Sequence, residues 1–229
     1  MITLRPHLDR GHSQYDWLDS RFSFSFADYY DPDQMGFSTL RVINEDHIRP
    51  GGSFDMHPHR DMEILTYIIK GELLHQDSLG HRETIRSGEL QRITAGRGIF
   101  HSESNPSDEE VHLLQIWIFP REHGLDPSYE TMHFPAVPPK GLQLLASADG
   151  RDGSATMQQD AALFHATVNA GETLSYSVTS GRRVWLQLIR GSLKVNGTAL
   201  GAGDGAAISD EETLLFAASE DARFLLFNL

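Results

Sequence analysis

The sequence predicts an all-β protein built from two small β-barrel or β-sandwich domains. Helical periodicity is scarce, short β-branched and aromatic runs recur along the whole chain, and Gly, Asn and Asp separate these runs. Many short strands with regular turn signals are typical of sandwiches and barrels. The clearest predicted strands are residues 40–43, 65–69, 113–119, 184–189, 193–195 and 224–227.

Two dipeptides mark predicted hairpin turns between such strands. Leu79-Gly80 separates two short polar-apolar segments, and Asn196-Gly197 directly follows a predicted strand. Asn-Gly suits a type I′ turn because both of its central residues need positive φ. We therefore expect a tight hairpin at each of these positions.

An internal repeat predicts that the two halves of the chain share one fold. Residues 68–73 and 188–193 have the same order of side chains: apolar, apolar, basic, Gly, polar, Leu. A Gly followed by an acidic residue then recurs in each half, at Gly88-Glu89 and at Gly203-Asp204. Unrelated β-domains can share such fragments, but their common order favours a duplication.

The predicted domain organisation follows from this repeat and from the position of the prolines. A Pro-rich stretch lies between the two copies, and its composition suits a connector with little regular structure. We expect an N-terminal domain over residues 1–133, a connector over 134–145 and a C-terminal domain over 146–229.

Composition narrows the functional classes. The chain has 229 residues, no cysteine, and 19 basic against 32 acidic side chains, which gives a formal net charge of −13. The absence of thiols excludes disulfides, Cys-based zinc sites, iron–sulfur clusters and a thiol nucleophile. The charge argues against direct nucleic-acid binding, and no apolar run is long enough to span a membrane. With no visible signal peptide, we expect a soluble cytoplasmic protein.

The histidines indicate a metal site in the first predicted domain. Of the 12 histidines, only His165 lies beyond residue 133. His57 and His59 are two residues apart, so on an extended strand both side chains face the same side. His101 and Glu103 repeat this spacing behind another Gly-containing turn. Three imidazoles and one carboxylate leave coordination positions open, as catalytic metal sites require.

Either pair alone could be a surface coincidence, so the prediction depends on both pairs occurring in one predicted domain. Neutral imidazole is a common ligand of divalent transition metals, and oxygen and nitrogen donors without thiolate suit several of them. Donor chemistry alone therefore leaves iron(II), nickel, manganese, copper and zinc as alternatives.

The same segments resemble the two sequence motifs of cupins and, more closely, the pirin family. The first motif is matched by Gly51-(x5)-His57-x-His59-(x3)-Glu63, and the end of the second by Gly98-(x2)-His101-(x3)-Asn105. The fuller strings at 57–63 and 94–103 are similar to those of pirins, and the resemblance covers at least residues 12–119. Gly71 stands one position later than the cupin pattern, and Thr94 stands where proline is common.

This resemblance implies a bicupin, with two β-barrel domains of the double-stranded β-helix type. It also implies that His57, His59, His101 and Glu103 are the metal ligands of the N-terminal domain. Glu63 corresponds to a ligand in most cupins, but pirins use the later glutamate instead. Glu63 shares the alternation of the histidine pair, so the spacing permits it either as a ligand or behind the ligands, and we place it behind them.

The resemblance further implies a quercetin 2,3-dioxygenase, which opens a flavonol ring with O2 and releases carbon monoxide. Iron(II) is then the favoured ion, with nickel, manganese, copper, zinc or cobalt as alternatives. The ion would act as a Lewis acid on the flavonol oxygens, and Glu103 is the candidate general base for the hydroxyl proton.

Two other functions remain open at this point. Pirin-like proteins also act as non-enzymatic regulators, in which the metal senses redox state and a partner protein is bound. A third alternative is a cupin that isomerises or hydrolyses a small polar substrate. A roomy apolar cavity beside the metal would favour a flavonol, and Phe54, Ile99 and Phe100 are candidates for its lining.

The other histidines have plainer interpretations. His75 and His81 flank the predicted turn at 79–80 and are expected at the surface. His112 adjoins a core strand and is expected to be a buried, hydrogen-bonded histidine. In the second half, the positions that correspond to the ligands are Ser177, Thr179 and Phe216, so we expect no metal there.

Overall fold

The computed structural model describes residues 1–135 and 139–229, and nearly all of its regular elements are strands, which confirms the all-β prediction. Residues 136–138 of the predicted connector lie outside the described residues. The chain divides into two compact units, which we describe separately. The histidine-rich unit comprises Gly11–Val137 and Ala155–Gln159, and the C-terminal unit comprises Met1–Arg10, Pro138–Ser154 and Asp160–Leu229.

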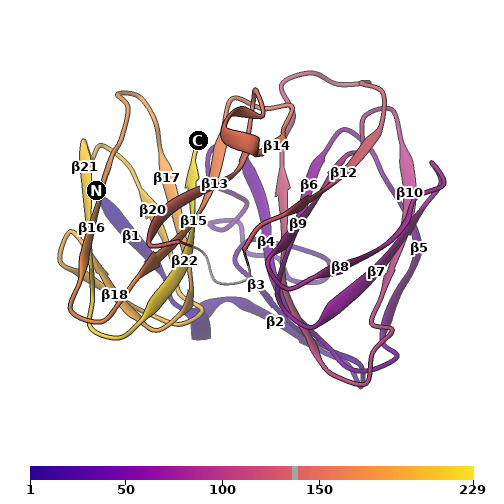
Figure 1. The fold of residues 1–229 in the computed structure, drawn as a ribbon, viewed down its shortest axis with the longest axis horizontal. Coiled ribbons are helices and arrows are strands. Elements are labelled where there is room, and N and C mark those ends of the chain that lie inside the picture. The colour runs from indigo at the N-terminus through magenta and orange to yellow at the C-terminus, as the bar shows by residue number, and fades with distance from the viewer. Residues whose placement is uncertain (136–138) are drawn as a thin grey trace. The chain divides into compact units, whose positions relative to one another are not determined.

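The histidine-rich unit consists of two antiparallel sheets (Figure 1). The larger sheet has the strand order β12-β9-β6-β11-β4-β3-β2, and the smaller has the order β5-β10-β7-β8. The strands of the larger sheet are β2 (Gly11–Gln14), β3 (Leu18–Phe22), β4 (Leu40–Ile48), β6 (Glu63–Lys70), β9 (Glu89–Thr94), β11 (Val111–Ile118) and β12 (Ser128–His133). Those of the smaller sheet are β5 (Ser53–His59), β7 (Glu72–Asp77), β8 (Arg82–Arg86) and β10 (Ile99–Ser104). The short strand β14 (Ala155–Thr156) lies in the second segment of this unit.

The C-terminal unit also has a larger and a smaller sheet. The larger sheet includes strands in the order β1-β20-β17-β22-β15-β13, and the smaller has the order β16-β21-β18-β19. The larger-sheet strands are β1 (Ile2–Arg5), β13 (Gly141–Ser147), β15 (Ala162–Val168), β17 (Val184–Arg190), β20 (Gly205–Ile208) and β22 (Ala222–Asn228). The smaller-sheet strands are β16 (Thr173–Ser177), β18 (Ser192–Val195), β19 (Thr198–Gly201) and β21 (Thr213–Ala218).

Two short 3₁₀-helices, η1 (His7–Asp9) and η2 (Arg151–Gly153), are the helical elements of the described residues. Within this part of the chain, therefore, no helix has the length and apolar character needed to cross a membrane.

The two units repeat one strand arrangement. The order β9-β6-β11-β4-β3 in one corresponds to β20-β17-β22-β15-β13 in the other, and β5-β10-β7-β8 corresponds to β16-β21-β18-β19. Gly71 and Gly191 join corresponding strands, with φ of 80° and 87°. The hairpin predicted at Asn196-Gly197 joins β18 and β19, and both residues have positive φ. These correspondences agree with the internal repeat in the sequence.

The N-terminal ten residues differ from the predicted domain division, which placed them with residues 11–133. β1 pairs with β20 from Ile2↔Ile208 to Arg5↔Gly205, and these residues therefore belong to the C-terminal unit. In the histidine-rich unit the corresponding edge, beside β9, is occupied by β12. Local pattern along the sequence carries no signal for such a distant strand pairing.

The interior of the two units is filled differently. In the C-terminal unit, side chains from both sheets form one apolar core, which includes Leu186, Leu193, Phe216 and Phe224. Among the described residues of the histidine-rich unit, one apolar cluster surrounds Ile68 and Leu113 and another surrounds Ile64 and Ile93.

A row of three polar side chains, which we call the polar rung, runs across β6, β9 and β11 between the two apolar clusters of the histidine-rich unit. Thr66 lies between Ile64 and Ile68 on the same face of β6, and its cross-strand partners are Gln91 and Gln115. Glu103, one of the predicted site residues, is hydrogen-bonded to Gln91 and Gln115 of this rung.

Candidate metal centre

The three predicted imidazole ligands converge on two paired strands of the smaller sheet. β5 and β10 are antiparallel, and their register places His101 opposite His57. The ring centroids are 4.5 Å apart for His57 and His101, 4.7 Å for His59 and His101, and 4.8 Å for His57 and His59. One nitrogen of each ring lies within 4.8 Å of the other two. The spacing of two in each sequence pair thus produces one three-nitrogen group.

Two nitrogens of this group lack a hydrogen-bond partner among the described residues. Nε2 of His59 and Nε2 of His101 are buried and unpaired, and such buried polar atoms are rare in folded proteins. Burial lowers the pKa of His59 to about 3 and that of His101 to about 4, so both rings are neutral near pH 7. Neutral imidazoles whose nitrogens have no partner fit a transition-metal ion.

Glu103 is buried beside this group and is held by two amides of the polar rung. Gln91 Nε2 donates to Glu103 Oε1 over 3.1 Å, and Gln115 Nε2 donates to Glu103 Oε2 over 3.0 Å. Burial acts to raise the pKa of Glu103, but the neighbouring imidazoles and the two amides hold it below its ordinary value. The carboxylate is therefore ionised, and its Oε1 lies 3.9 Å from Nδ1 of His101.

The structure adds a residue that the sequence had placed at the surface. His75 is fully buried, because the pairing of β7 with β10 sets it opposite Glu103. Its Nδ1 lies 3.5 Å from Nδ1 of His101, and its Nε2 lies 3.1 Å from Oδ2 of Asp77. The surface prediction for His75 was wrong, although His75 and Asp77 share the spacing of two that marked the other pairs. His81 is 38% exposed and binds the same carboxylate.

The structure places Glu63 away from the three imidazoles. Its Oε2 accepts hydrogen bonds of 3.1 Å from Thr94 Oγ1 and from the backbone N–H of Gln158. Burial raises its pKa. Glu63 directly precedes Ile64, whose side chain packs with Trp117 near the site, so Glu63 points to the opposite face of β6. The expected position behind the ligands is therefore not the one observed.

The position of Glu63 is explained by the backbone between β5 and β6. β5 ends at His59, β6 begins at Glu63, and Asp61 between them has a φ of 50°. A residue in the left-handed region interrupts the alternation of an extended chain. Counting alternate positions from His59 to Glu63 therefore does not predict a common face.

A cavity of about 520 Å³ opens onto His57, His59 and Glu103. Trp117 contacts the ring of His59 edge-on, with centroids 5.0 Å apart. The lining combines polar side chains, among them Asn44, Asp46 and Gln115, with six aromatic ones, which are Tyr15, Trp17, Phe22, Phe26, Phe54 and Trp117. Of the predicted lining residues, Phe54 borders this cavity. Ile99 instead packs in the cluster around Ile64, and Phe100 is 53% exposed.

Two further groups of potential ligands occur among the described residues. One, of His75, His101 and Glu103, shares residues with the predicted site, and the other lies on the opposite face of the larger sheet. Glu45, His47 and His112 bring one donor atom each within 4.8 Å of one another. Here the imidazoles already have carboxylate partners: His112 Nε2 bonds Glu45 over 2.9 Å, and His47 Nδ1 bonds Glu110 over 2.9 Å. The prediction of a hydrogen-bonded His112 agrees with this contact, although the side chain is half-buried.

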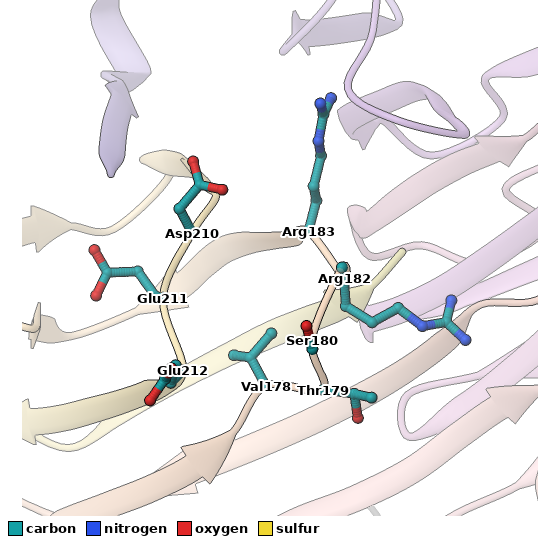
Figure 2. A pocket seen from close by; sticks show the side chains of 9 residues that line it. Val178, Thr179, Ser180, Arg182, Arg183, Asp210, Glu211 and Glu212 are labelled. Carbon is teal, nitrogen blue, oxygen red and sulfur yellow. The ribbon is translucent and has the colours of Figure 1, made fainter.

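In the C-terminal unit, the described residues contain no comparable group of ligands. Phe216 fills the apolar core, and Ser177 ends β16. A polar cavity of about 650 Å³ lies between the loops that follow β16 and β20 (Figure 2). Figure 2 shows Arg182 and Arg183 pointing away from Glu211, and Glu211 pairs with the N-terminal amine. These charges do not converge on a common point.

Comparison with known proteins follows the same division of the chain. The family model described as Pirin matches residues 5–118, and the model described as Quercetinase C-terminal cupin domain matches residues 144–229. The chain is 48% identical to a protein of Escherichia coli K12 named quercetin 2,3-dioxygenase, over all of this chain and 99% of that protein. It is 40% identical to a pirin-like protein of Caulobacter vibrioides, over 99% of this chain and 98% of that protein.

Solved structures show the same similarity. A crystal structure of YhhW from Escherichia coli matches with a TM-score of 0.97 and 48% identity, and covers all of this chain and 97% of that one. The bacterial pirin YhhW in complex with nickel(II) matches with a TM-score of 0.96 and 47% identity, over all of this chain and 99% of that one. Together with the two matched domains, these similarities confirm the predicted two-domain cupin fold.

Proposed function

The chain belongs to the pirin family, and from this premise we propose that it is a metal-dependent dioxygenase that opens a flavonol-like substrate with O2 and releases carbon monoxide. The observation that carries the proposal is the group of three converging imidazoles, with two unpaired buried nitrogens, beside a cavity lined by aromatic rings. The relatives named quercetin 2,3-dioxygenase and the nickel complex of a bacterial pirin support it.

In this proposal, His57, His59 and His101 hold one divalent transition-metal ion, and Glu103 is its fourth ligand. When bound, the ion supplies Lewis acidity toward the hydroxyl and carbonyl oxygens of the substrate. The low pKa values of His59 and His101 keep both rings neutral near pH 7, so one nitrogen of each ring has a lone pair for the ion. Iron(II) is the ion that the sequence resemblance favours, and nickel(II) is the ion of the related crystal structure.

Glu103 has a second role in the proposal, as the base that accepts the proton of the flavonol hydroxyl. Its pKa is held below the ordinary value, so it is ionised and ready to accept a proton near pH 7. Gln91 and Gln115 each donate to one of its oxygens and thereby fix the orientation of the carboxylate. A proton taken from the substrate would stay within this buried polar rung.

The cavity supports a planar aromatic substrate over a small polar one. Its volume of about 520 Å³ lies within the usual range of small-molecule sites, roughly 300–1,000 Å³. Trp17, Phe54 and Trp117 present ring faces and edges that can pack against a flavonol. Gln115 and Asn44 add a few polar groups to the lining, which can orient hydroxyl groups.

The test is to prepare metal-free protein, reload it separately with iron(II), nickel(II), manganese(II), cobalt(II), copper(II) or zinc(II), and add quercetin in air. We expect at least one ion to give O2 consumption, loss of the near-visible absorbance of quercetin and release of carbon monoxide. Glu103→Gln should bind the ion but lose most of the turnover, and His101→Gln should lose both. His112→Gln, outside the site, should retain both.

Protein that binds metal tightly but leaves quercetin and O2 unchanged with every ion would overturn the dioxygenase. That result would favour the regulatory alternative, in which a partner protein is bound without turnover.

A further inference from the structure

A line of three buried or half-buried side chains runs from the proposed metal ligand His101 to the β7–β8 hairpin. Nδ1 of His101 faces Nδ1 of His75 at 3.5 Å, and Nε2 of His75 faces Oδ2 of Asp77 at 3.1 Å. The side chains of His75 and Asp77 have no solvent exposure. Neither residue borders the aromatic cavity, so neither is placed to contact a substrate.

The direction of the hydrogen bonds along this line follows from Asp77. An ionised carboxylate can only accept, and Asp77 is ionised, because hydrogen bonds from His75 and His81 outweigh its burial and lower its pKa. His75 therefore carries a proton on Nε2. A neutral imidazole then has its lone pair on Nδ1, which faces His101. The proton of His101 is drawn to its own Nδ1, and its Nε2 is left bare.

The atom left bare by this arrangement is the one that has no partner in the structure. Nε2 of His101 is buried and unpaired, and the His101 ring packs against His57 and His59. His57 follows the same rule, since its Nδ1 lies 2.7 Å from the backbone carbonyl of Asp55. In metalloproteins, a ligating histidine typically donates its other N–H to such an acceptor, which fixes the tautomer.

We propose that Asp77 and His75 are positioning residues that set the tautomer of His101, so that Nε2 of His101 is presented to the metal. The inference rests on the proposed metal site but not on dioxygenase activity. Asp77 acts through His75, and His75 acts through His101, so the pair determines how well the site holds its ion before any substrate arrives.

Two features of the surroundings hold the pair in place. Oδ1 of Asp77 accepts hydrogen bonds from the backbone N–H groups of Leu79 and His81, at 2.9 and 3.0 Å, which fixes the carboxylate at the turn. The ring of Tyr129 stacks on that of His75, with centroids 4.7 Å apart and an interplanar angle of 20°. Packing against Tyr129 therefore fixes the orientation of the His75 ring, and Asp77 fixes which ring nitrogen carries the proton.

The deciding variant is Asp77→Asn. The two backbone N–H groups require an oxygen at the position of Oδ1, so the amide nitrogen must take the position of Oδ2 and face His75. That nitrogen donates, which forces the proton of His75 from Nε2 to Nδ1. The proton of His75 then points at the proton on Nδ1 of His101. The variant thus reverses one tautomer while keeping the turn.

The matched control is His81→Gln. His81 Nδ1 contacts the same carboxylate at 2.9 Å, but it is not on the line to His101. A change that reflects only the loss of a hydrogen bond to Asp77 would appear in both variants, whereas a change in the tautomer of His101 would appear only in Asp77→Asn. Thermal unfolding of each metal-free variant shows whether the fold is retained.

Two measurements test the inference, and neither needs turnover. Long-range ¹H–¹⁵N NMR of the metal-free and zinc-loaded protein should show His75 protonated on Nε2 and His101 on Nδ1 in the native protein and in His81→Gln. In Asp77→Asn, His75 should be protonated on Nδ1. Competition with a chromogenic chelator should show zinc(II) and nickel(II) bound about 10- to 100-fold more weakly by Asp77→Asn, and with unchanged Kd by His81→Gln.

The inference is overturned if folded Asp77→Asn keeps the native Kd, or if His75 keeps its proton on Nε2. It is also overturned if both variants weaken binding equally. A native protein that shows the expected tautomers and the expected difference in Kd, but consumes no O2 with quercetin, would refute the dioxygenase and leave this inference standing.

Discussion

Gln115 donates a hydrogen bond of 3.0 Å from Nε2 to Oε2 of Glu103, across the interior between the two sheets of the histidine-rich unit. Gln91 donates to the other carboxylate oxygen, and its amide also contacts Thr66 Oγ1 at 3.2 Å. The polar rung of the larger sheet therefore holds a charged group that the smaller sheet supplies. The hydrogen bond from Gln91 is buried, whereas that from Gln115 lies at the wall of the aromatic cavity.

We expect Gln115→Leu to raise the pKa of Glu103, since one of the hydrogen bonds that lower it is lost. A carboxylate with a lowered folded-state pKa contributes stability above its ordinary pKa, and this contribution is lost as the pH falls through the folded-state value. In the variant the two pKa values lie closer together, so less stability should be lost as the pH falls, and the loss should end at a higher pH. Above that window, the unfolding free energy should fall by about 1.5–3 kcal/mol, the usual contribution of a hydrogen bond to a charged group.

Urea unfolding of the metal-free protein at a series of pH values measures this change. Thr66→Val is the control, because it removes the contact of Gln91 with Thr66 and leaves both hydrogen bonds to Glu103. An unchanged pH dependence in Gln115→Leu, with a folded protein, would show that Glu103 does not depend on this amide.

Metal binding should stabilise the protein through the site of His57, His59 and His101, and not through the group of Glu45, His47 and His112. A ligand that binds only the folded state at 100 times its Kd adds about 2.7 kcal/mol to the unfolding free energy. We expect nickel(II) to raise the melting temperature of the native protein and of His112→Gln, and chelator to reverse the rise. His59→Gln should show little rise. If His112→Gln also lost the effect, the group on the opposite sheet face would be the binding site instead.

The sequence could predict the groups whose geometry depends on local alternation. His57 and His59 lie on one extended strand, so their spacing of two was enough to bring both rings together. The Asn196-Gly197 turn was likewise predictable, because its backbone requirement is local. The pairing of β5 with β10 was not visible locally, but the same spacing at His101 and Glu103 indicated that the two segments contribute to one site.

Features that depend on distant register could not be predicted in this way. His75 is buried because β7 pairs with β10, and a turn beside it in the sequence says nothing about that register. Glu63 was misplaced because the left-handed residue Asp61 breaks the alternation on which the count relied. The amides of Gln91 and Gln115 come from strands of the opposite sheet, and an isolated glutamine in a strand carries no recognisable signal.

His165 should make the unfolding free energy of the C-terminal unit depend on pH. Burial lowers its pKa from 6.5 to about 4, with a further contribution from Arg223. The unfolded chain takes up a proton below about pH 6.5 and the folded chain does not, so stability is lost as the pH falls from about 6.5 to about 4. The difference corresponds to roughly 3 kcal/mol, since one pKa unit is about 1.4 kcal/mol.

We expect His165→Gln to flatten this dependence, as measured by the difference in unfolding free energy between variant and native protein at each pH. Both proteins are measured without metal. The difference between them is used because His59 and His101 contribute a loss of the same sign to each. His123→Gln is the control and should leave the curve unchanged, because its side chain is 76% exposed and its contact with Asp61 is 3.7 Å long. A native-like slope in folded His165→Gln would contradict the assignment.

Three glycines with nearly the same backbone conformation separate the cost of positive φ from the cost of a close contact. Gly71, Gly181 and Gly191 have φ of 80°, 83° and 87°, and a Cβ at these positions meets different surroundings. At Gly181 nothing lies within 4 Å, at Gly71 the carbonyl oxygen of Glu110 lies at 2.9 Å, and at Gly191 that of Asp221 lies at 2.3 Å. Alanine should therefore destabilise the protein least at Gly181, more at Gly71 and most at Gly191.

Gly181→Ala should cost about 1–2 kcal/mol of unfolding free energy, the cost of a left-handed conformation for a residue with a Cβ. Gly191→Ala should cost about 1–3 kcal/mol more, because a backbone carbonyl cannot turn away as the end of a flexible side chain can. Urea unfolding of both variants in the C-terminal unit gives the comparison directly, since the φ cost cancels in their difference. Equal losses would mean that the β17–β18 turn relaxes away from Asp221 freely. Unequal losses would mean that the glycine shared by the two halves of the repeat is needed for close backbone packing, beyond its conformational freedom.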